Sequence, residues 1–197
     1  MKPRTLGSGD KEQRRARIEQ TALELFRARG FDHVTVEDVC HEARVAPATF
    51  YRYFGSKEEV VFSYTDDFTQ ALQSALDLSA HLPEPERLTA VLSRFAEFLE
   101  SRQEAISLRD PIVLGHPRLM QRTLGVQRDL EGVLAVGLAQ HRGQGEPDAM
   151  VLLEAGIGML VLRVAVRTWR AGGASSLVDA TRETLTALDR LASTVSR

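Results

Sequence analysis

Residues 34–60 constrain the fold of this chain most strongly, because they combine two short helical patterns, a tight turn and the start of a third helix. Thr35 and Asp38, three residues apart, form the pattern of an N-cap with its capping-box partner, which predicts a short helix that follows Thr35. Pro47 suits the first position of a second helix, since its missing N–H would have had no partner there. Residues 44–45 leave room only for a sharp turn, so the segment predicts a helix-turn-helix.

The second helix of this pair separates aromatic from polar side chains. Phe50 and Phe54 are four residues apart and share a face, which we expect to be buried. Gly55 ends the helix, and Ser56 with Glu59 predicts a second capping box at the start of the next one. The remaining side chains lie largely on the other faces: Ala48, Thr49, Tyr51, Arg52 and Tyr53.

The motifs T-V-E-D-V, F-Y-R-Y-F and S-K-E-E, in this order and spacing, resemble the DNA-binding region of TetR-family transcriptional regulators over about residues 12–62. Two positions depart from the family pattern. Arg44 stands where the turn usually carries glycine, and Ala46 stands where serine or threonine often caps the reading helix. We expect the turn to cost something of order 1 kcal/mol and to differ in shape.

The resemblance implies an all-α fold with an N-terminal three-helix helix-turn-helix domain and a C-terminal helical ligand-binding and dimerisation domain. The expected divisions are a basic flexible arm at 1–11, the DNA-binding domain at 12–57 and the effector-binding and dimerisation domain at 58–197. The implied function is a ligand-responsive regulator, a repressor, that binds a palindromic operator as a homodimer. A small-molecule effector would release it, and the last two helices, 147–170 and 176–195, would form the dimer interface.

The resemblance also assigns DNA-contacting residues. Arg52 is the candidate for bidentate contact with guanine, Ala48 and Thr49 for contact with a thymine methyl group, and the tyrosine hydroxyls for phosphate. The alternatives are that Arg52 pairs with a glutamate, that Tyr53 packs sideways, and that Thr35 only caps its helix. The full set of candidates is Thr35, Pro47, Ala48, Thr49, Tyr51, Arg52, Tyr53 and Lys57.

Effector-binding residues are expected between the C-terminal helices, although apolar stripes at helical spacing are more often ordinary core. An arginine beside these helices, such as Arg109, Arg163 or Arg167, would meet an anionic group or extend its head to solvent. The candidates for lining an effector site are Phe95, Phe98, Leu99, Met120, Leu124 and Trp169.

Helical periodicity continues outside the reading unit. We expect one helix over 12–29, a single helix from Ser56 to about residue 79, and breaks at 83–85, around Asp110-Pro111 and over 115–117.

Charge is distributed unevenly along the chain. Residues 1–57 carry eleven basic and eight acidic side chains, a net charge of +3, whereas the remainder carries fourteen and nineteen, a net charge of −5. The positive half is the one expected to meet phosphate. The basic arm at 1–11 would follow the DNA backbone; the alternative is a solvated tail. The N-terminus lacks the apolar core of a signal peptide and Arg163 interrupts the best apolar run, so we expect a cytoplasmic protein with no membrane partner.

Catalytic and cofactor signatures are not evident in this sequence. The histidines show no metal-ligand spacing with each other or with Cys40, and Gly7-Ser8-Gly9 lacks the preceding strand and the lysine of a phosphate loop. We therefore expect no enzyme activity, no metal and no cofactor beyond an effector. Cys40 is expected to be a packed thiol, with redox sensing as the alternative. The rival function is a DNA-binding protein without a small-molecule switch.

Overall fold

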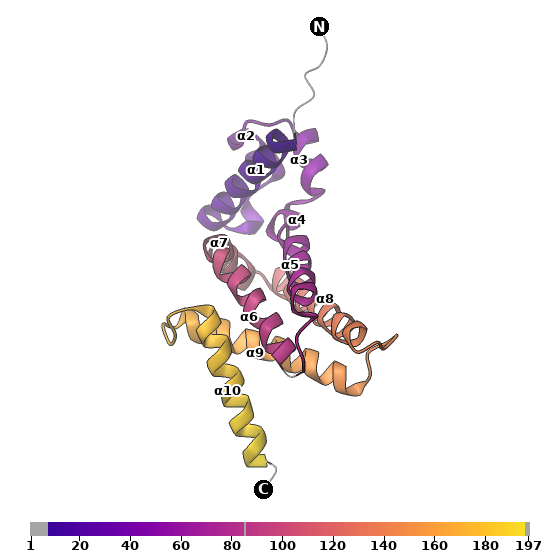
Figure 1. Cartoon of the computed structure of the whole chain (residues 1–197). Helices are drawn as coiled ribbons and strands as arrows, with labels where there is room; N and C mark the ends of the chain where they lie inside the picture. The colour runs from indigo at the N-terminus through magenta and orange to yellow at the C-terminus, as the bar shows by residue number, and fades with distance from the viewer. Residues whose placement is uncertain (1–7, 85, 196–197) are drawn as a thin grey trace. The chain divides into compact units, whose positions relative to one another are not determined.

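The structure, a computed structural model, describes residues 8–84 and 86–195, and its regular secondary structure over those ranges is entirely helical (Figure 1). This confirms the all-α prediction. Residues 1–7 of the expected arm lie outside the described residues, whereas residues 8–11 are already helical. The helices are α1 (Ser8–Arg29), the 3-10 helix η1 (Phe31–His33), α2 (Val36–Glu42), α3 (Pro47–Phe54), α4 (Lys57–Val61), α5 (Thr65–Ser79), α6 (Glu86–Ser101), α7 (Gln103–Leu114), α8 (Pro117–His141), α9 (Ala149–Arg170) and α10 (Leu177–Val195).

The chain divides into two compact units that do not follow the functional boundary expected after residue 57. Unit 1 combines the chain up to Thr65 with Glu104–Thr123, and unit 2 combines Asp66–Gln103 with Leu124–Arg197. Helix α7 and the first residues of α8 therefore belong to the unit that contains the helix-turn-helix. The functional division at residue 57 stays a prediction.

Unit 1 is built around α1, whose residues Ile18, Ala22 and Phe26 are fully or almost fully buried. Phe31 of η1 packs edge-on against Phe26, with ring centroids 5.0 Å apart. Helices α2 and α4 both contact α1, so the buried face of α1 supports the whole reading unit. The helix expected over 12–29 is confirmed, and it begins earlier, at Ser8.

The single helix expected from Ser56 to about residue 79 is wrong, because α4 ends at Val61 and α5 begins at Thr65. The carbonyl groups at this break bond side chains instead of continuing the helix. Arg109 Nε donates to the Val61 carbonyl (3.2 Å), Thr65 Oγ1 to the Phe62 carbonyl (2.8 Å), and a nitrogen of Arg15 to the Ser63 carbonyl (3.1 Å). Side chains from distant parts of the sequence thus stabilise a turn that helical periodicity alone does not indicate.

The break expected at Asp110-Pro111 is also wrong, since Pro111 lies inside α7. A proline within a helix loses one backbone hydrogen bond and normally costs about 3 kcal/mol. Here the helix ends one turn later, and the Pro111 carbonyl accepts from the N–H of Gly115 at 3.1 Å. The second expected break, over 115–117, is confirmed.

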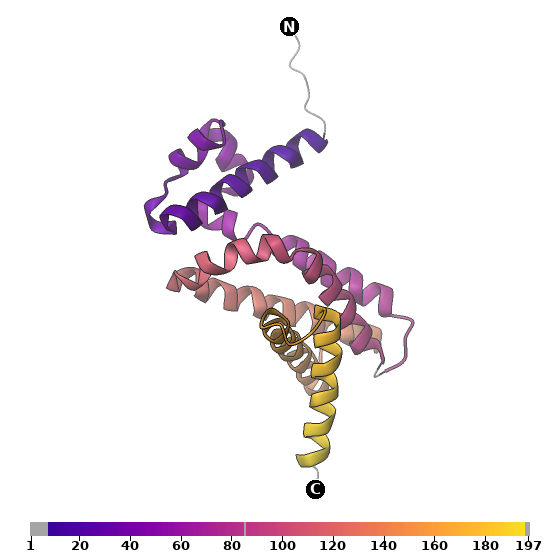
Figure 2. The same ribbon diagram turned by 90° about the vertical axis from the view of Figure 1, so that its left-hand side faces the viewer.

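Unit 2 is a helical bundle in which α10 packs against both α9 and α6 (Figure 2). Close helix contacts need small residues at two positions. A Cβ on Gly137 of α8 would lie 2.4 Å from a methyl carbon of Leu76 on α5, and one on Gly158 of α9 would lie 3.2 Å from Leu134. Glycine at these positions therefore permits the packing of α8 against its neighbours.

Polar contacts at the end of α8 add to this packing. Arg142 donates to Glu84 at 2.6 Å and to both carboxylate oxygens of Glu154 at 2.8 and 2.6 Å. The hydrogen bond with Glu84, followed by those with Glu154, raises the pKa of Arg142 further. The bidentate geometry ties the start of α9 to the end of α8.

Candidate nucleic-acid interface

The reading unit begins with the cap on α2. The Thr35 N–H donates to Asp38 Oδ2 at 2.8 Å, and the Asp38 N–H donates to Thr35 Oγ1 at 3.1 Å, which is the reciprocal capping box that the sequence predicts. The hydrogen bond from the Thr35 side chain, followed by that from its backbone N–H, lowers the pKa of the Asp38 carboxyl. Thr35 is therefore a cap, and a role in DNA contact stays a prediction.

The turn between α2 and α3 is closed by two backbone hydrogen bonds and contains a non-glycine residue in the left-handed region. The N–H of Arg44 donates to the His41 carbonyl (3.2 Å) and that of Val45 to the Cys40 carbonyl (3.0 Å). These bonds hold Arg44 at a φ of 51°, as the sequence comparison with glycine suggested. An arginine in this conformation costs of order 1 kcal/mol relative to glycine.

Helix α3 buries its aromatic pair and exposes the opposite surface. Phe50 and Phe54 are 0% and 5% exposed, which confirms the predicted inward face. Gly55 ends the helix at a φ of 71°. Pro47 occupies the first helical position, and Ala46 caps the helix without a side-chain hydrogen bond, as expected from its missing hydroxyl. The exposed or half-buried side chains of α3 are Pro47, Ala48, Thr49, Tyr51, Arg52 and Tyr53.

The aromatic residues on this surface organise its basic group. The Arg52 guanidinium lies over the Tyr53 ring at 5.3 Å, and Tyr53 packs partly sideways against Phe54. Tyr51 is 50% exposed and meets Phe50 edge-on at 5.7 Å. The N–H groups of an arginine lie in the plane of its guanidinium, so stacking on a ring leaves them free for other acceptors.

Lys57, one of the candidates for DNA contact, bonds carbonyl groups of its own chain, and its contact with DNA stays a prediction. Its Nζ donates to the carbonyls of Phe31 at 2.7 Å and Val34 at 3.1 Å, and lies 4.3 Å from the centre of the Phe31 ring. Those bonds fasten the segment before α2 to the start of α4. The capping box expected at Ser56 is half formed: Ser56 accepts from the Glu59 N–H, but the Glu59 carboxylate bonds Arg122.

Arg109 of α7 is a buried charge that holds three parts of unit 1 together, and its side chain is 5% exposed. It donates to the Val61 and Ala105 carbonyls and to the Ser63 hydroxyl, and it forms an ion pair with Glu19 of α1. From the sequence, Arg109 was expected either to meet an anionic ligand or to extend to solvent. The acid that it meets is Glu19, from the same chain.

The guanidinium of Arg109 also lies over the Tyr64 ring at 5.3 Å. Burial raises the pKa of Tyr64, and the nearby Arg109 charge opposes that shift. The break between α4 and α5 is therefore held by Arg109, whose hydrogen bonds and ion pair all lie within unit 1.

The residues expected to bind an effector are not equivalent in the structure. Phe95 is 2% exposed and belongs to the core, and its ring stacks on that of Phe98 with centroids 6.1 Å apart. Phe98 also lines a groove of about 410 Å³ between α5 and α6, together with charged residues such as Arg94 and Arg102. Leu99 and Trp169 are half-buried.

Met120 and Leu124, both on α8, are more exposed than the other candidates. They are 42% and 62% exposed, and they belong to different compact units. Whether the candidate residues bind an effector stays a prediction.

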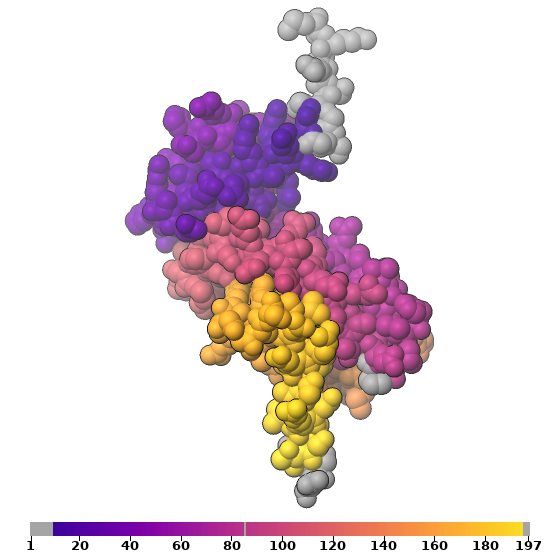
Figure 3. Space-filling view, turned by 60° about the vertical axis from the view of Figure 1, so that its left-hand side comes forward, coloured from indigo at the N-terminus to yellow at the C-terminus, as the bar shows by residue number. Residues whose placement is uncertain are grey.

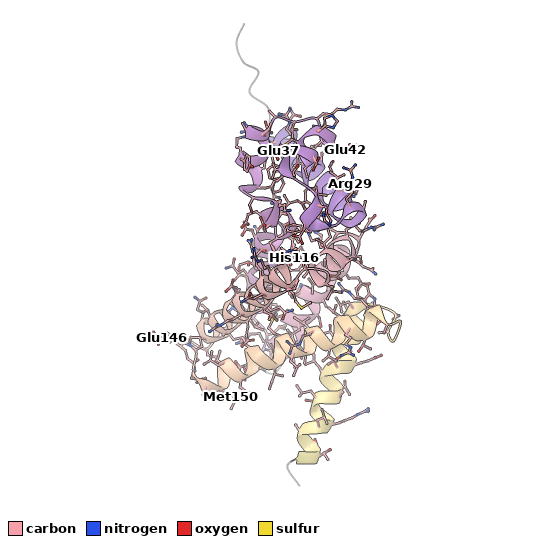
Figure 4. All side chains as sticks on the ribbon, turned by 180° about the vertical axis from the view of Figure 1, so that it is seen from behind. Arg29, Glu37, Glu42, His116, Glu146 and Met150 are labelled. Atoms are coloured by element: carbon pink, nitrogen blue, oxygen red, sulfur yellow. The ribbon has the colours of Figure 1, made fainter. Side chains whose placement is uncertain are left out.

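An exposed apolar face runs along the length of α9. Leu153, Leu160 and Val164 recur along one side of the helix and are 58%, 44% and 41% exposed. Met150, at the start of α9 in Figure 4, lies at the outer edge of its unit. Beyond α9, the C-terminal half of α10 extends past the rest of unit 2 (Figure 3), and Leu191 there is 64% exposed.

The length and composition of α9 would also allow it to cross a membrane, with a mean hydropathy of 2.0 despite Arg163. About a third (33%) of the apolar 18-residue stretch of this helix is buried inside unit 2. A core helix of a water-soluble protein passes the same test, so this is weak evidence for a membrane span.

Two further features are the arrangement of potential metal ligands and the environment of Cys40. Within residues 8–84 and 86–195, no three histidine, cysteine or acidic side chains gather in a way that could hold a metal ion. Cys40 is 3% exposed, and burial, followed by the charge of Glu37, raises the pKa of its thiol. A protonated, covered thiol is a poor nucleophile, which favours the packing role.

A capped α2, a tight turn and an α3 with a buried aromatic face and an exposed polar one define a helix-turn-helix DNA-binding protein. Residues 18–64 match the model of bacterial regulatory proteins of the tetR family, and residues 83–193 match that of the MftR C-terminal domain. The chain belongs to the TetR family of transcriptional regulators, whose members bind DNA, dimerise and bind small-molecule ligands and are not enzymes.

Two relatives illustrate the match. The regulator TcmR of Streptomyces glaucescens is 31% identical over 72% of this chain and 66% of its own length, slightly less than two thirds. The regulator MftR of Mycobacterium tuberculosis is 28% identical over 83% of each chain.

Solved structures support the fold. A TetR-family regulator from Syntrophomonas wolfei matches with a TM-score of 0.64 at 18% identity, over 92% of this chain and 95% of its own. FadR from Bacillus subtilis, solved in complex with stearoyl-CoA, matches with a TM-score of 0.59 at 21% identity, over 88% and 96%. At these identities the likeness concerns the fold alone.

Proposed function

We propose that this protein is a cytoplasmic, ligand-responsive repressor that binds a palindromic operator as a homodimer and leaves it when a small-molecule effector binds. The observation that carries the DNA-binding part is the exposed surface of α3, where small, aromatic and basic side chains surround a buried aromatic pair. The proposals of a dimer and of an effector rest on the C-terminal region.

The surface of α3 suits insertion into the major groove. Arg52 has the bidentate geometry that reads guanine, and its stacking on Tyr53 supports a fixed orientation. Ala48 and Thr49 are small enough to approach a thymine methyl group, while Tyr51 can donate to phosphate. Pro47 and Tyr53 complete this surface.

Thr35 and Lys57 have a supporting role in this proposal. Thr35 holds the start of α2 through its capping box. Lys57 positions the segment before α2, because its ammonium already has two carbonyl acceptors; reaching a phosphate would require it to give up at least one of them.

Dimerisation through α9 and α10 is supported by the exposed apolar side chains of α9. Isolated exposed leucines are common on protein surfaces, but a row at helical spacing is typical of a helix that packs against another helix. A second copy related by a two-fold axis would cover the same face in both chains. It would also place two reading helices for half-sites about 34–36 Å apart on the DNA.

The effector is proposed from the size of the C-terminal region, and its candidate contacts remain Phe95, Phe98, Leu99, Met120, Leu124 and Trp169. A ligand that binds the form released from DNA about a hundredfold more tightly than the other form shifts the equilibrium by about 2.7 kcal/mol, enough to empty an operator. The alternative is a constitutive DNA-binding protein, which would bind its operator equally well under all ligand conditions.

The test of DNA binding is in-vitro selection from random duplexes followed by salt titration of the selected sequence. We expect a palindrome with half-sites about one helical turn apart. Arg52→Ala should then lose about 1–3 kcal/mol of binding energy and relax preference at one base position. Arg128→Ala, which removes an exposed arginine of α8 outside the proposed DNA-binding and dimer surfaces, is the matched control and should bind like the parent. Binding without sequence preference would contradict the proposal.

The test of dimerisation is sedimentation of Leu160→Glu, which places a charge in the exposed row of α9. We expect a monomer, because a second copy would have to bury that charge. Leu114→Glu changes an equally apolar, 69% exposed residue of α7 and should leave the dimer intact. If Leu160→Glu and Leu114→Glu both sedimented with the mass of the parent assembly, α9 would be excluded as the interface.

A further inference from the structure

Arg44 is the one residue other than glycine with a positive φ among the described residues. The other positive-φ positions, Gly30, Gly55, Gly143 and Gly172, all carry the residue that adopts this conformation without steric cost. The two hydrogen bonds of the turn would hold a glycine equally well. Local stability therefore gives no reason for an arginine here.

The side chain of Arg44 is exposed and has no hydrogen bond, ion pair or ring contact within residues 8–84 and 86–195. It differs in this respect from the buried Arg109 and from Arg52, which stacks on Tyr53. Glu42, labelled on α2 in Figure 4, is only two residues away but forms no ion pair with it. The Arg44 guanidinium is thus available to an external acceptor.

The position of Arg44 indicates what that acceptor is. The residue lies in the turn that leads into α3, three residues before Pro47. From the turn through the end of α3, over residues 43–56, the charged side chains are Arg44 and Arg52 alone. The entry to the reading helix is otherwise formed by small and apolar residues, which offer no positive charge to phosphate.

We propose that Arg44 contacts a DNA phosphate next to the N-terminus of the reading helix α3. In this proposal the DNA contact explains why the turn carries an arginine although glycine would be more stable there. The inference rests on the proposed insertion of α3 into the major groove. Strained backbone conformations concentrate at functional sites, where the surrounding structure imposes them. Here the strained residue carries an exposed cation that has no partner within residues 8–84 and 86–195.

The experiment compares three full-length proteins: the parent, Arg44→Gly and Arg44→Lys. Glycine removes both the charge and the backbone strain, whereas lysine keeps both. Affinity for the selected palindrome and for an unrelated duplex is measured between 50 and 200 mM salt, and the urea midpoint of unfolding is measured without DNA.

We expect Arg44→Gly to unfold at a higher urea concentration and yet bind both duplexes more weakly. Loss of one phosphate contact lowers the salt slope by about 0.9, so the affinity deficit should shrink about 3.5-fold over this fourfold change in salt. Arg44→Lys should keep the parent's slope and its urea midpoint.

Three results would overturn the inference while the proposed function stands. The first is an Arg44→Gly protein with the affinity and salt slope of the parent, and the second is an Arg44→Lys protein that loses as much as the glycine variant. A loss confined to one base position of the palindrome would place Arg44 on a base and overturn the phosphate assignment. A parent protein that selects no sequence would overturn the proposed function, and this inference with it.

Discussion

Replacing the buried Arg109 by methionine should lower the free energy of unfolding by about 3 kcal/mol. Methionine keeps the apolar stem but removes every donor. Breaking a buried ion pair from one side costs about 3–5 kcal/mol, because the partner charge remains without compensation. The Glu19 side chain is 20% exposed and can recover part of its hydration, which places the expected loss at the lower end of that range.

The assay is urea unfolding followed by far-UV circular dichroism at one fixed protein concentration, because the stability of a dimer depends on concentration. A double-mutant cycle with Glu19→Gln separates the ion pair from the carbonyl contacts. We expect an interaction energy of about 1.5 kcal/mol or more, as for a hydrogen bond between charged groups in a partly buried site.

Arg122→Met is the matched control for this cycle. Arg122 also pairs with an acid, Glu59, at 2.7 Å and also lies over a ring, but its side chain is 40% exposed. Water therefore screens the pair, and the loss should be at most about 1 kcal/mol. If Arg109→Met cost no more than this control, or if the cycle were additive, the junction would not depend on the buried charge.

Three further changes test local features. Thr35→Ala should cost about 1 kcal/mol of unfolding free energy because α2 loses its cap, whereas Thr35→Ser should not; equal urea midpoints would disprove this. Burial, followed by the charge of Arg87, lowers the pKa of His141 below its usual 6.5, so the unfolded chain takes up the proton first as the pH falls. The stability contributed by neutral His141 should be present above about pH 6.5 and should decrease as the pH falls below that value. His141→Gln should therefore make the melting temperature depend less on pH below about 6.5. Cys40 should react with a thiol reagent only slowly until urea unfolds the protein, and rapid reaction of the folded protein would restore the redox alternative.

The features that sequence analysis predicted correctly are those that neighbouring residues determine. Thr35 and Asp38 cap α2 from three residues apart, and Phe50 and Phe54 share a face because the helical repeat places them there. The positive φ of Arg44 was expected from the family pattern, in which this position of the turn usually carries glycine. These local signals depend on neighbouring residues only, so the sequence alone was enough to locate the reading unit.

The features that were missed depend on residues far apart in the sequence. Lys57 bonds carbonyls 26 and 23 residues away, and Arg109 meets an acid 90 residues away. The first pairing holds Lys57 against its own chain, and its contact with DNA stays a prediction. The second pairing stabilises the turn that interrupts the helix expected to run from Ser56 to residue 79. Periodicity carries no information about such partners, because it describes one element at a time.

The division of unit 1 between two stretches of sequence limits where this regulator can be cut and recombined. A hybrid spliced at residue 65 would transplant the reading helix but leave Arg109 behind, and Glu19 would then face a foreign side chain. The hybrid would keep the DNA specificity of the transplanted helix, but its unit 1 would be less stable. Exchange of operator recognition between relatives is therefore expected to succeed when residues 104–123 travel with the first 65, or when only the surface of α3 is replaced.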